Sequence, residues 1–101
     1  MRFGHDLDAV IIAEQDGELA GSVIAGWDGW RGRLYRLAVS PARRRQGVAA
    51  ALLRAAEARL RALGAARVDA MVLEDNALGQ SLWRANGYRE HDDWRRWVKW
   101  L

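Results

Sequence analysis

The chain has 101 residues, a length that is typical of a single domain with one hydrophobic core. Half of the residues are hydrophobic and 29% are charged, which is the composition of a folded globular protein and excludes a disordered one. There is no cysteine and no apolar stretch near the ~20 residues that cross a bilayer, which excludes disulfides, thiolate metal sites and membrane spans. With only two histidines and no signal-peptide pattern, we expect a cytoplasmic protein that holds no metal and has no membrane partner.

The net charge of +3 is unevenly distributed along the chain. Residues 31–67 contain ten arginines and a single acidic residue, Glu57. Such a block attracts a polyanion, either nucleic acid or a phosphorylated cofactor, although arginines on a solvated surface would give the same count. Because the block coincides with a glycine turn, we favour the phosphorylated cofactor. No RNA- or DNA-binding motif is present, so we expect no nucleic-acid partner.

Three β-strands are predicted first. Residues 9–13 are apolar and β-branched, Asp16-Gly17 is a strong hairpin signal, and residues 19–27 form the partner strand. A second turn at residues 26–29 leads to a third strand over residues 33–39, which ends before Pro41.

The hydrophobic period then changes to that of a helix. Apolar side chains recur three or four positions apart over residues 48–63, on one face that ends at Leu63, while Glu57 lies on the opposite, charged face. Gly64 is the expected left-handed stop. A fourth strand is predicted over residues 67–73. Asn76 can cap a short helix over residues 77–85, whose inward side chains would be Leu78, Leu82 and Ala85. The aromatic tail, residues 94–101, is predicted to form one more strand. One α/β (α+β) domain over residues 1–101 follows, with a mixed, mostly antiparallel sheet covered by helices.

The segment between the third strand and the first helix carries the strongest functional signal. The first amides of a helix lack intrahelical partners and carry partial positive charge, so a pyrophosphate fits there if the backbone can come close. Gly47 removes the side chain at the closest approach, and Ala49 and Ala50 keep the first turn low. The arginine run at residues 43–45 can add charge-assisted hydrogen bonds. The turn therefore suits a diphosphate.

Two other phosphate-binding motifs are excluded by their spacing. A Walker loop needs a second glycine followed by lysine and serine or threonine, and the only lysine of the chain is Lys99. The dinucleotide fingerprint needs three glycines after the first strand of a βαβ unit, whereas here one glycine follows a third strand.

Three blocks of the sequence, in order and sensibly spaced, resemble the GNAT acetyltransferase superfamily. Arg44-x-x-Gly47-x-Ala49 matches the Arg/Gln-x-x-Gly-x-Gly/Ala motif of that family. Residues 34–41 are similar to the strand that precedes the motif, and residues 74–76 with 82–88 are similar to the later helix and its Gly-Phe/Tyr ending. The resemblance covers roughly residues 9–98. One motif alone would be weak evidence, but three blocks in register are specific.

The resemblance implies an N-acetyltransferase that moves the acetyl group of acetyl-coenzyme A to a primary amine, on a small molecule or a peptide or protein N-terminus, by direct attack. The backbone of Leu37 and Val39 would pair with the pantetheine arm, which requires the third and fourth strands to splay apart. The Leu37 N–H is also the candidate donor to the developing oxyanion. The residues expected to bind the cofactor are Leu37, Val39, Arg43, Arg44, Arg45, Gln46, Gly47, Val48, Ala49, Ala50, Asn76 and Trp83.

The catalytic acid and base are less clearly marked. Many family members have a tyrosine at the position of Trp83, and an indole N–H cannot protonate a thiolate near neutral pH. Because a thiol has a pKa of ~8.5, coenzyme A can leave as thiolate and take its proton from water. The candidates for the base are Glu74, at the end of the fourth strand, and Tyr35, on the third; each also fits an ordinary surface or packing residue.

The N-terminal strand and helices of the family, which help to wall the acceptor site, are expected to be missing, because only about eight residues precede the first predicted strand. That strand would have an unpaired edge, which is an aggregation hazard. We therefore predict a homodimer that covers this edge or the aromatic tail. A catalytically silent acyl-coenzyme A-binding module is the alternative function that this shortening favours.

Overall fold

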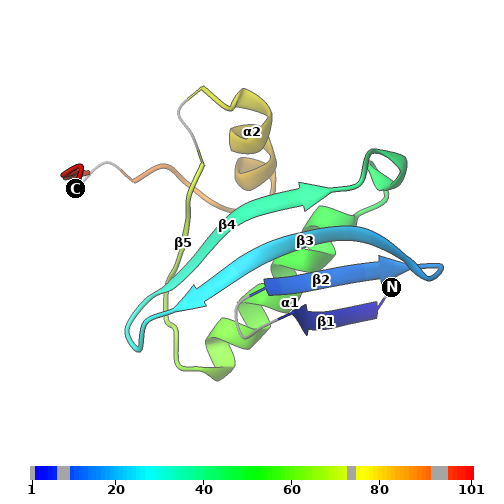
Figure 1. Ribbon diagram of the computed structural model, residues 1–101, viewed down its shortest axis with the longest axis horizontal. Helices are drawn as coiled ribbons and strands as arrows, with labels where there is room; N and C mark the ends of the chain where they lie inside the picture. The colour runs from blue at the N-terminus through cyan, green and yellow to red at the C-terminus, as the bar shows by residue number, and fades with distance from the viewer. Residues whose placement is uncertain (1, 7–9, 73–74, 92–95) are drawn as a thin grey trace.

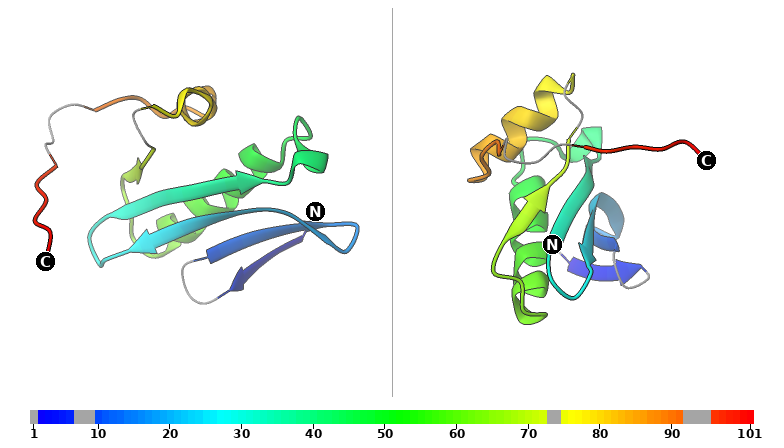
Figure 2. Two further views of the ribbon diagram at one scale, coloured as in Figure 1. Left: turned by 45° about the horizontal axis from the view of Figure 1, so that its top comes forward. Right: turned by 90° about the vertical axis from the view of Figure 1, so that its left-hand side faces the viewer.

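The computed structural model describes residues 2–6, 10–72, 75–91 and 96–101 of the chain. Its strands form one five-stranded sheet in the order β1-β2-β3-β4-β5, and helix α1 lies along one face of that sheet (Figures 1 and 2). The elements are β1 (Arg2–Asp6), β2 (Val10–Gln15), β3 (Glu18–Trp27), β4 (Gly32–Val39), the short 3-10 helix η1 (Pro41–Arg43), α1 (Val48–Ala62), β5 (Val68–Ala70) and α2 (Ala77–Ala85). The predicted α+β class with a mixed, mostly antiparallel sheet is confirmed, because β1 to β4 are antiparallel and β5 is parallel to β4.

Two tight turns set the register of the central strands. Asp16 and Gly17 have φ angles of 56° and 78°, the left-handed pair that a two-residue hairpin requires, so the predicted β2–β3 turn is confirmed. In the β3–β4 turn, one carboxylate oxygen of Asp28 accepts hydrogen bonds from the backbone N–H groups of Trp30 (2.9 Å) and Arg31 (2.7 Å).

The core lies between α1 and the sheet. The buried side chains of α1 recur at helical spacing and face those of β2, β3 and β4; they are Val48, Leu52, Leu53, Ala56 and Leu60. Gly32 lets the helix approach β4, because a Cβ there would lie 2.8 Å from Leu60 Cδ1. Leu63, which was predicted to face inward, is 45% exposed because α1 ends at Ala62.

Helix α2 has a different inward face from the one predicted. Trp83 is its buried residue, with an exposed fraction of 6%, whereas Leu78 is 72% exposed and Ala85 is also exposed. The prediction that Leu78, Leu82 and Ala85 face inward was therefore wrong for Leu78 and Ala85. The physical reason is that an indole has more apolar surface to bury than the leucine and alanine side chains, so its burial sets the rotation of this short helix.

Tyr88, which follows α2, joins this segment to α1. Its hydroxyl donates a 2.5 Å hydrogen bond to a carboxylate oxygen of Glu57, and its ring meets the Trp83 ring edge-on with centroids 5.1 Å apart. Burial raises the pKa of Tyr88, and the hydrogen bond to the negative Glu57 raises it further. Glu57 was predicted to lie on the solvated side of α1; its partner on another segment makes it a structural residue.

The expectation of a missing N-terminal strand was wrong. β1 pairs with β2 from Arg2 opposite Glu14 to Asp6 opposite Val10, so the edge of β2 is covered. The roughly eight residues before the first predicted strand had seemed too few, but five residues are enough for an edge strand. Only three residues separate β1 from β2, fewer than one helical turn, so the helices that the family places there have no room.

The predicted C-terminal strand is also corrected. Residues 96–101 form no strand, and Trp97 and Trp100 are each 92% exposed. In Figure 2 this tail extends away from the sheet on the side opposite α1. Residues 94 and 95 of the predicted strand lie outside the described residues. A strand exists only where a partner accepts its hydrogen bonds, and within the described part of the chain nothing pairs with the outer edge of β5. No helix in that part is long and apolar enough to cross a membrane.

Tyr88→Phe is expected to lower the free energy of unfolding by about 1–2 kcal/mol at neutral pH, because it removes a partly buried hydrogen bond to a charged group. The folded-state pKa of Tyr88 is raised, so its contribution is complete below the unfolded-state pKa of ~10 and is lost as the pH rises above that value. Urea denaturation from pH 7 to pH 11 should show the gap between wild type and variant closing. Tyr35→Phe is the control, since the Tyr35 hydroxyl makes no hydrogen bond within the described residues; an equal loss in both variants would contradict the assignment.

The homodimer remains a prediction, and the exposed tail is the surface that we expect it to cover. Sedimentation at micromolar concentration should give twice the mass of the chain. The double variant Trp97→Ser, Trp100→Ser should shift the protein to monomer, because exposed aromatic side chains contribute most to an interface of this kind. Trp30→Ser, at another exposed tryptophan, should leave the dimer intact. A wild-type monomer would show that the prediction is wrong.

Candidate functional site

The start of α1 presents backbone N–H groups that the protein does not use. Gly47 is the N-cap residue with a φ of 77°, and no side chain in the described part of the chain caps the helix. The first intrahelical bond runs from the Ala51 N–H to the Gly47 carbonyl oxygen at 3.0 Å, which leaves the N–H groups of residues 48–50 without a partner in the helix. A Cβ on Gly47 would meet no atom within 4 Å, so the space in front of these amides is open to an anion.

The three arginines beside this turn have different surroundings. The Arg43 guanidinium contacts Asp16 at 3.2 Å and Glu18 at 3.3 Å, and its side chain is only 17% exposed. Arg43 therefore links the turn to the β2–β3 hairpin by ion pairs. These contacts do not support the prediction that Arg43 lies beside a pyrophosphate. Arg44 and Arg45 are exposed, and Arg45 has a φ of 63°. These two arginines, not all three, are available to a ligand at the helix start.

β4 and β5 part after a short parallel pairing. The pairs run from Gly32 opposite Val68 to Leu34 opposite Ala70, and the last bond goes from the Met71 N–H to the Leu34 carbonyl oxygen. Beyond Leu34, no described residue pairs with β4 on that side, and Figure 1 shows β5 turning away toward α2. β4 and β5 correspond to the third and fourth predicted strands, so the predicted separation of those two strands is confirmed.

The open edge of β4 carries the backbone groups of Leu37 and Val39. The Ser40 N–H bonds to the Ala20 carbonyl oxygen of β3 at 2.8 Å, so Ser40 and Ala38 point their backbone groups toward β3. Because backbone groups alternate between the two edges of a strand, those of Leu37 and Val39 point toward the open edge. This edge is available to an extended ligand that adds as a strand.

A β-bulge interrupts β4 between its two halves. The register with β3 shifts between the pair Ile24–Tyr35 and the pair Ser22–Ala38, and Arg36 has a φ of 55°. A bulge adds one residue to a strand and re-aims the groups that follow it. Here it separates the paired half of β4 from the half with the open edge, and Leu37 is the first residue beyond it.

The remaining predicted residues are placed as follows. The Asn76 side chain accepts a hydrogen bond from the Gly79 N–H at 2.9 Å, so its predicted capping role is confirmed. Trp83 is 6% exposed and packs in the core, which leaves its predicted contact with a cofactor without support in the geometry. Glu74 lies outside the described residues.

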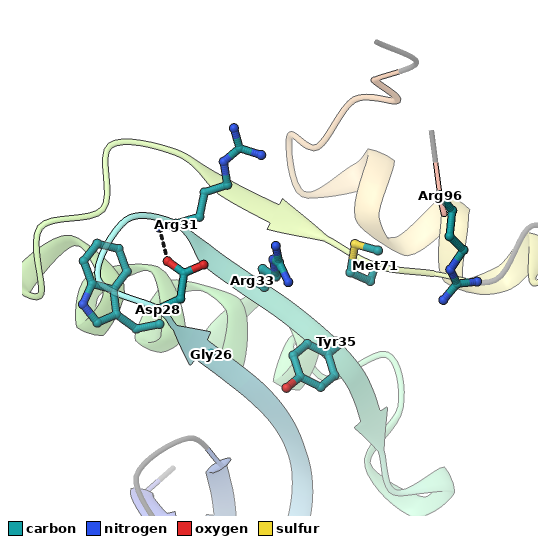
Figure 3. Close-up of a pocket in the computed structure, with 8 residues that line it drawn as sticks. Gly26, Asp28, Arg31, Arg33, Tyr35, Met71 and Arg96 are labelled. Carbon is teal, nitrogen blue, oxygen red and sulfur yellow. Dashed lines mark hydrogen bonds between the residues drawn. The ribbon is translucent and has the colours of Figure 1, made fainter. Parts of the chain in front are cut away.

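Tyr35 opens onto a cavity of about 440 Å³ on the face of the sheet away from α1 (Figure 3). The lining comes from β3, β4, the turn between them, the end of β5 and the tail; it consists of Gly26, Trp27, Asp28, Arg31, Arg33, Tyr35, Met71 and Arg96. Sequence reasoning found only Tyr35 in this set. The available signal was the alternation of Arg31, Arg33 and Tyr35, which places three polar side chains on one face of a strand.

Two charged groups in the cavity wall are held by local contacts. The backbone hydrogen bonds from Arg31 and Trp30 lower the pKa of Asp28, so its carboxylate is ionised at neutral pH (dashed line in Figure 3). The Arg31 guanidinium lies 4.5 Å from the centre of the Trp30 ring and 3.6 Å from a carboxylate oxygen of Asp69. Within the described residues, no three histidine, aspartate or glutamate side chains gather as a metal site.

Comparison with known proteins gives one family and a consistent set of structures. A model of the acetyltransferase (GNAT) family matches residues 2–88. An aminoglycoside antibiotic 6'-N-acetyltransferase from Acinetobacter haemolyticus superposes with a TM-score of 0.77 at 23% identity, over 93% of this chain and 72% of that one. An aminoglycoside acetyltransferase from an uncultured soil sample, in complex with sisomicin, gives a TM-score of 0.80 at 15% identity, over 95% and 68%. The PaiA N-acetyltransferase of Thermoplasma acidophilum, in complex with coenzyme A, gives 0.74 at 24% identity, over 82% and 52%. At these identities the likeness to the structures shows the fold.

The variants Arg43→Gln and Arg45→Gln are expected to have different effects, the first on the stability of the fold and the second on ligand binding. Arg45→Gln should weaken the affinity for coenzyme A about three- to tenfold, because it removes an exposed guanidinium beside the open amides. Arg43→Gln should weaken the affinity for coenzyme A less than about twofold. It should instead lower the melting temperature, because the partners of Arg43 are Asp16 and Glu18. Calorimetric titration and thermal melting measure the two effects. A larger affinity loss for Arg43→Gln would place that residue at the ligand.

Proposed function

This chain belongs to the GNAT acetyltransferase family, and from that premise we propose that it transfers the acetyl group of acetyl-coenzyme A to a primary amine by direct attack. The observation that carries the proposal is the pair of unused backbone surfaces, the uncapped start of α1 and the open edge of β4. The two surfaces follow one another along the chain through η1, so a single elongated ligand can use both. Solved relatives of the same fold include complexes with coenzyme A, which agrees with this cofactor.

The residues of the turn fit a coenzyme with linked phosphates. The amides of residues 46–50 would hold the pyrophosphate, with Arg44 and Arg45 beside it, and the open space at Gly47 lets the backbone come close. The backbone of Leu37 and Val39 would hold the pantetheine arm. The bound coenzyme supplies an acetyl thioester, which is open to attack by a neutral amine.

The chain would assist the transfer by positioning and by hydrogen bonding. The Leu37 N–H, just beyond the bulge, is the donor best placed to stabilise negative charge on the carbonyl oxygen. Tyr35 is the candidate base whose side chain opens onto the cavity, directly or through a water molecule. No side chain is needed as the acid, because a thiol of pKa ~8.5 can leave as thiolate and take its proton from water.

A coenzyme-binding module without turnover is the second candidate. It is favoured by the three-residue link between β1 and β2, which leaves no room for the helices that wall the acceptor site in the family. Incubation with acetyl-coenzyme A and a panel of amines, followed by detection of free thiol, distinguishes the two functions. Release of thiol that depends on the amine supports the transferase; tight binding with no release above background supports the silent module.

Gly47→Asp is expected to weaken acetyl-coenzyme A binding by at least tenfold. The new carboxylate would lie in the open space before the helix amides, where it repels phosphate and caps the same N–H groups. In wild type, millimolar acetyl-coenzyme A should raise the melting temperature, because a ligand that binds only the folded state stabilises it. In Gly47→Asp this rise should be much smaller.

Gly47→Asn is the matched control, because asparagine has the same shape, tolerates a positive φ and carries no charge. It should weaken binding less than Gly47→Asp does. If wild type gains no thermal stability from the cofactor, the cofactor assignment is wrong. If both variants bind like wild type, the pyrophosphate does not lie at the start of α1.

A further inference from the structure

The cavity on the face of the sheet away from α1 lies at the point where β4 and β5 part. The last paired residues of the two strands are Leu34 and Ala70. The residues that follow them, Tyr35 and Met71, both line the cavity. Figure 3 shows these two side chains near that of Arg33, on the same face of the strands. A thioester held at the open edge of β4 would therefore lie next to this cavity, and an amine in the cavity would lie within reach of it.

The charge of the cavity wall is mostly positive. Among the described residues, three arginines line it, Arg31, Arg33 and Arg96, against one carboxylate, that of Asp28. Asp28 is held in the turn, because its Oδ1 accepts hydrogen bonds from the N–H groups of Trp30 and Arg31, and the positive charge of Arg33 also acts on this carboxylate. Arg33 and Arg96 make no ion pair with a carboxylate in the described part of the chain. The described part of the wall thus offers the guanidinium groups of Arg33 and Arg96 to a ligand and carries more positive than negative charge.

Such a wall suits an acceptor of the opposite charge. Guanidinium groups form charge-assisted, often bidentate hydrogen bonds with carboxylates, whereas they repel ammonium groups. Aminoglycosides carry several ammonium groups, so the wall disfavours the acceptors of the aminoglycoside acetyltransferases that share this fold. The cationic wall therefore favours amines without further positive charge at the point where β4 and β5 separate.

We propose that the acceptor is an amine that carries carboxylate groups close to its reacting nitrogen, with Arg33 and Arg96 binding the carboxylates. The inference rests on the proposed acetyltransferase function and adds a substrate class to it. Free acidic amino acids and acidic peptide N-termini share this chemistry. Arg33 is placed on β4, two residues before Tyr35 on the same face, so a carboxylate bound there leaves the amine directed toward the parting strands.

The experiment compares acceptors of different charge, of which the acidic and neutral members have nearly the same shape. Three peptide amides with the same N-terminal glycine are offered, Gly-Asp-Asp, Gly-Asn-Asn and Gly-Arg-Arg, together with aspartate and its diamide as the free amino-acid arm. The kcat/KM for thiol release should fall from acidic to neutral to basic peptide, by about two- to fivefold at each step, as expected for partly exposed charge pairs. The preference should shrink at high salt, because exposed charges are screened. If the preference for the acidic acceptor is larger among the peptides than between aspartate and its diamide, the acceptor is a peptide N-terminus; the reverse result identifies a free amino acid.

Arg33→Glu is the variant that tests the wall. It should remove the preference for the acidic peptide and raise the rate with the basic one, while the affinity for acetyl-coenzyme A stays within about twofold of wild type. Arg54→Glu is the matched control, because Arg54 is an exposed arginine on α1, on the other face of the sheet. It makes the same change of net charge and should keep the wild-type preference.

A binding measurement without turnover separates this inference from the proposed function. Titration of the cofactor-saturated protein with the acidic and neutral peptides should show tighter binding of the acidic one in wild type and in Arg54→Glu, but not in Arg33→Glu. Selective binding with no thiol release would contradict the acetyltransferase and leave the charge preference of the cavity standing. Thiol release at equal kcat/KM for all three peptides, or a preference that Arg33→Glu leaves unchanged, would overturn the inference.

Discussion

β4 and β5 are bound to each other for three residues and then diverge, and the functional surfaces of this protein depend on that divergence. A longer parallel ladder would satisfy the backbone of Leu37 and Val39 within the sheet and leave nothing for a ligand to pair with. The bulge at Arg36 marks the same boundary, because the ladder with β3 changes register there. Up to Leu34, β4 is therefore paired on both sides, and beyond it the strand offers unsatisfied hydrogen-bonding groups.

Helix α1 has two roles, to cover the sheet and to present free backbone N–H groups at its start. Its buried side chains cover the sheet and form one side of the core, while its first turn exposes backbone N–H groups. Gly47 serves the second role alone. Its φ of 77° favours glycine, and the open space around it shows that packing does not require one. The absence of a side chain also gives close access to the amides. The residues that stabilise the fold and those that would hold phosphate are neighbours in the chain, and Val48 belongs to both sets, through its buried side chain and its backbone N–H group.

Local signals predicted those parts of the fold that depend on nearby residues. The Asp16-Gly17 turn, the length of α1 and the Asn76 cap follow from conformational preferences within a few positions, and all three are present. The errors concern partners that are distant in sequence. Whether β1 covers the edge of β2, whether the tail finds a strand to join and which side of α2 faces the core are decided by tertiary contacts that periodicity does not contain. Arg43 illustrates the same limit at the site, because the sequence shows three equivalent arginines and only the structure brings Asp16 and Glu18 to one of them.

The link between Arg43 and the β2–β3 hairpin has a consequence for any measurement of ionic effects on this protein. The link is a pair of charge contacts to carboxylates that are mostly in solvent, so dissolved ions weaken it. The same ions weaken the attraction of Arg44 and Arg45 for phosphate. Loosening of the turn and loss of direct attraction would then add together, and the dependence of affinity on ionic strength would overstate the number of guanidinium groups that touch the ligand.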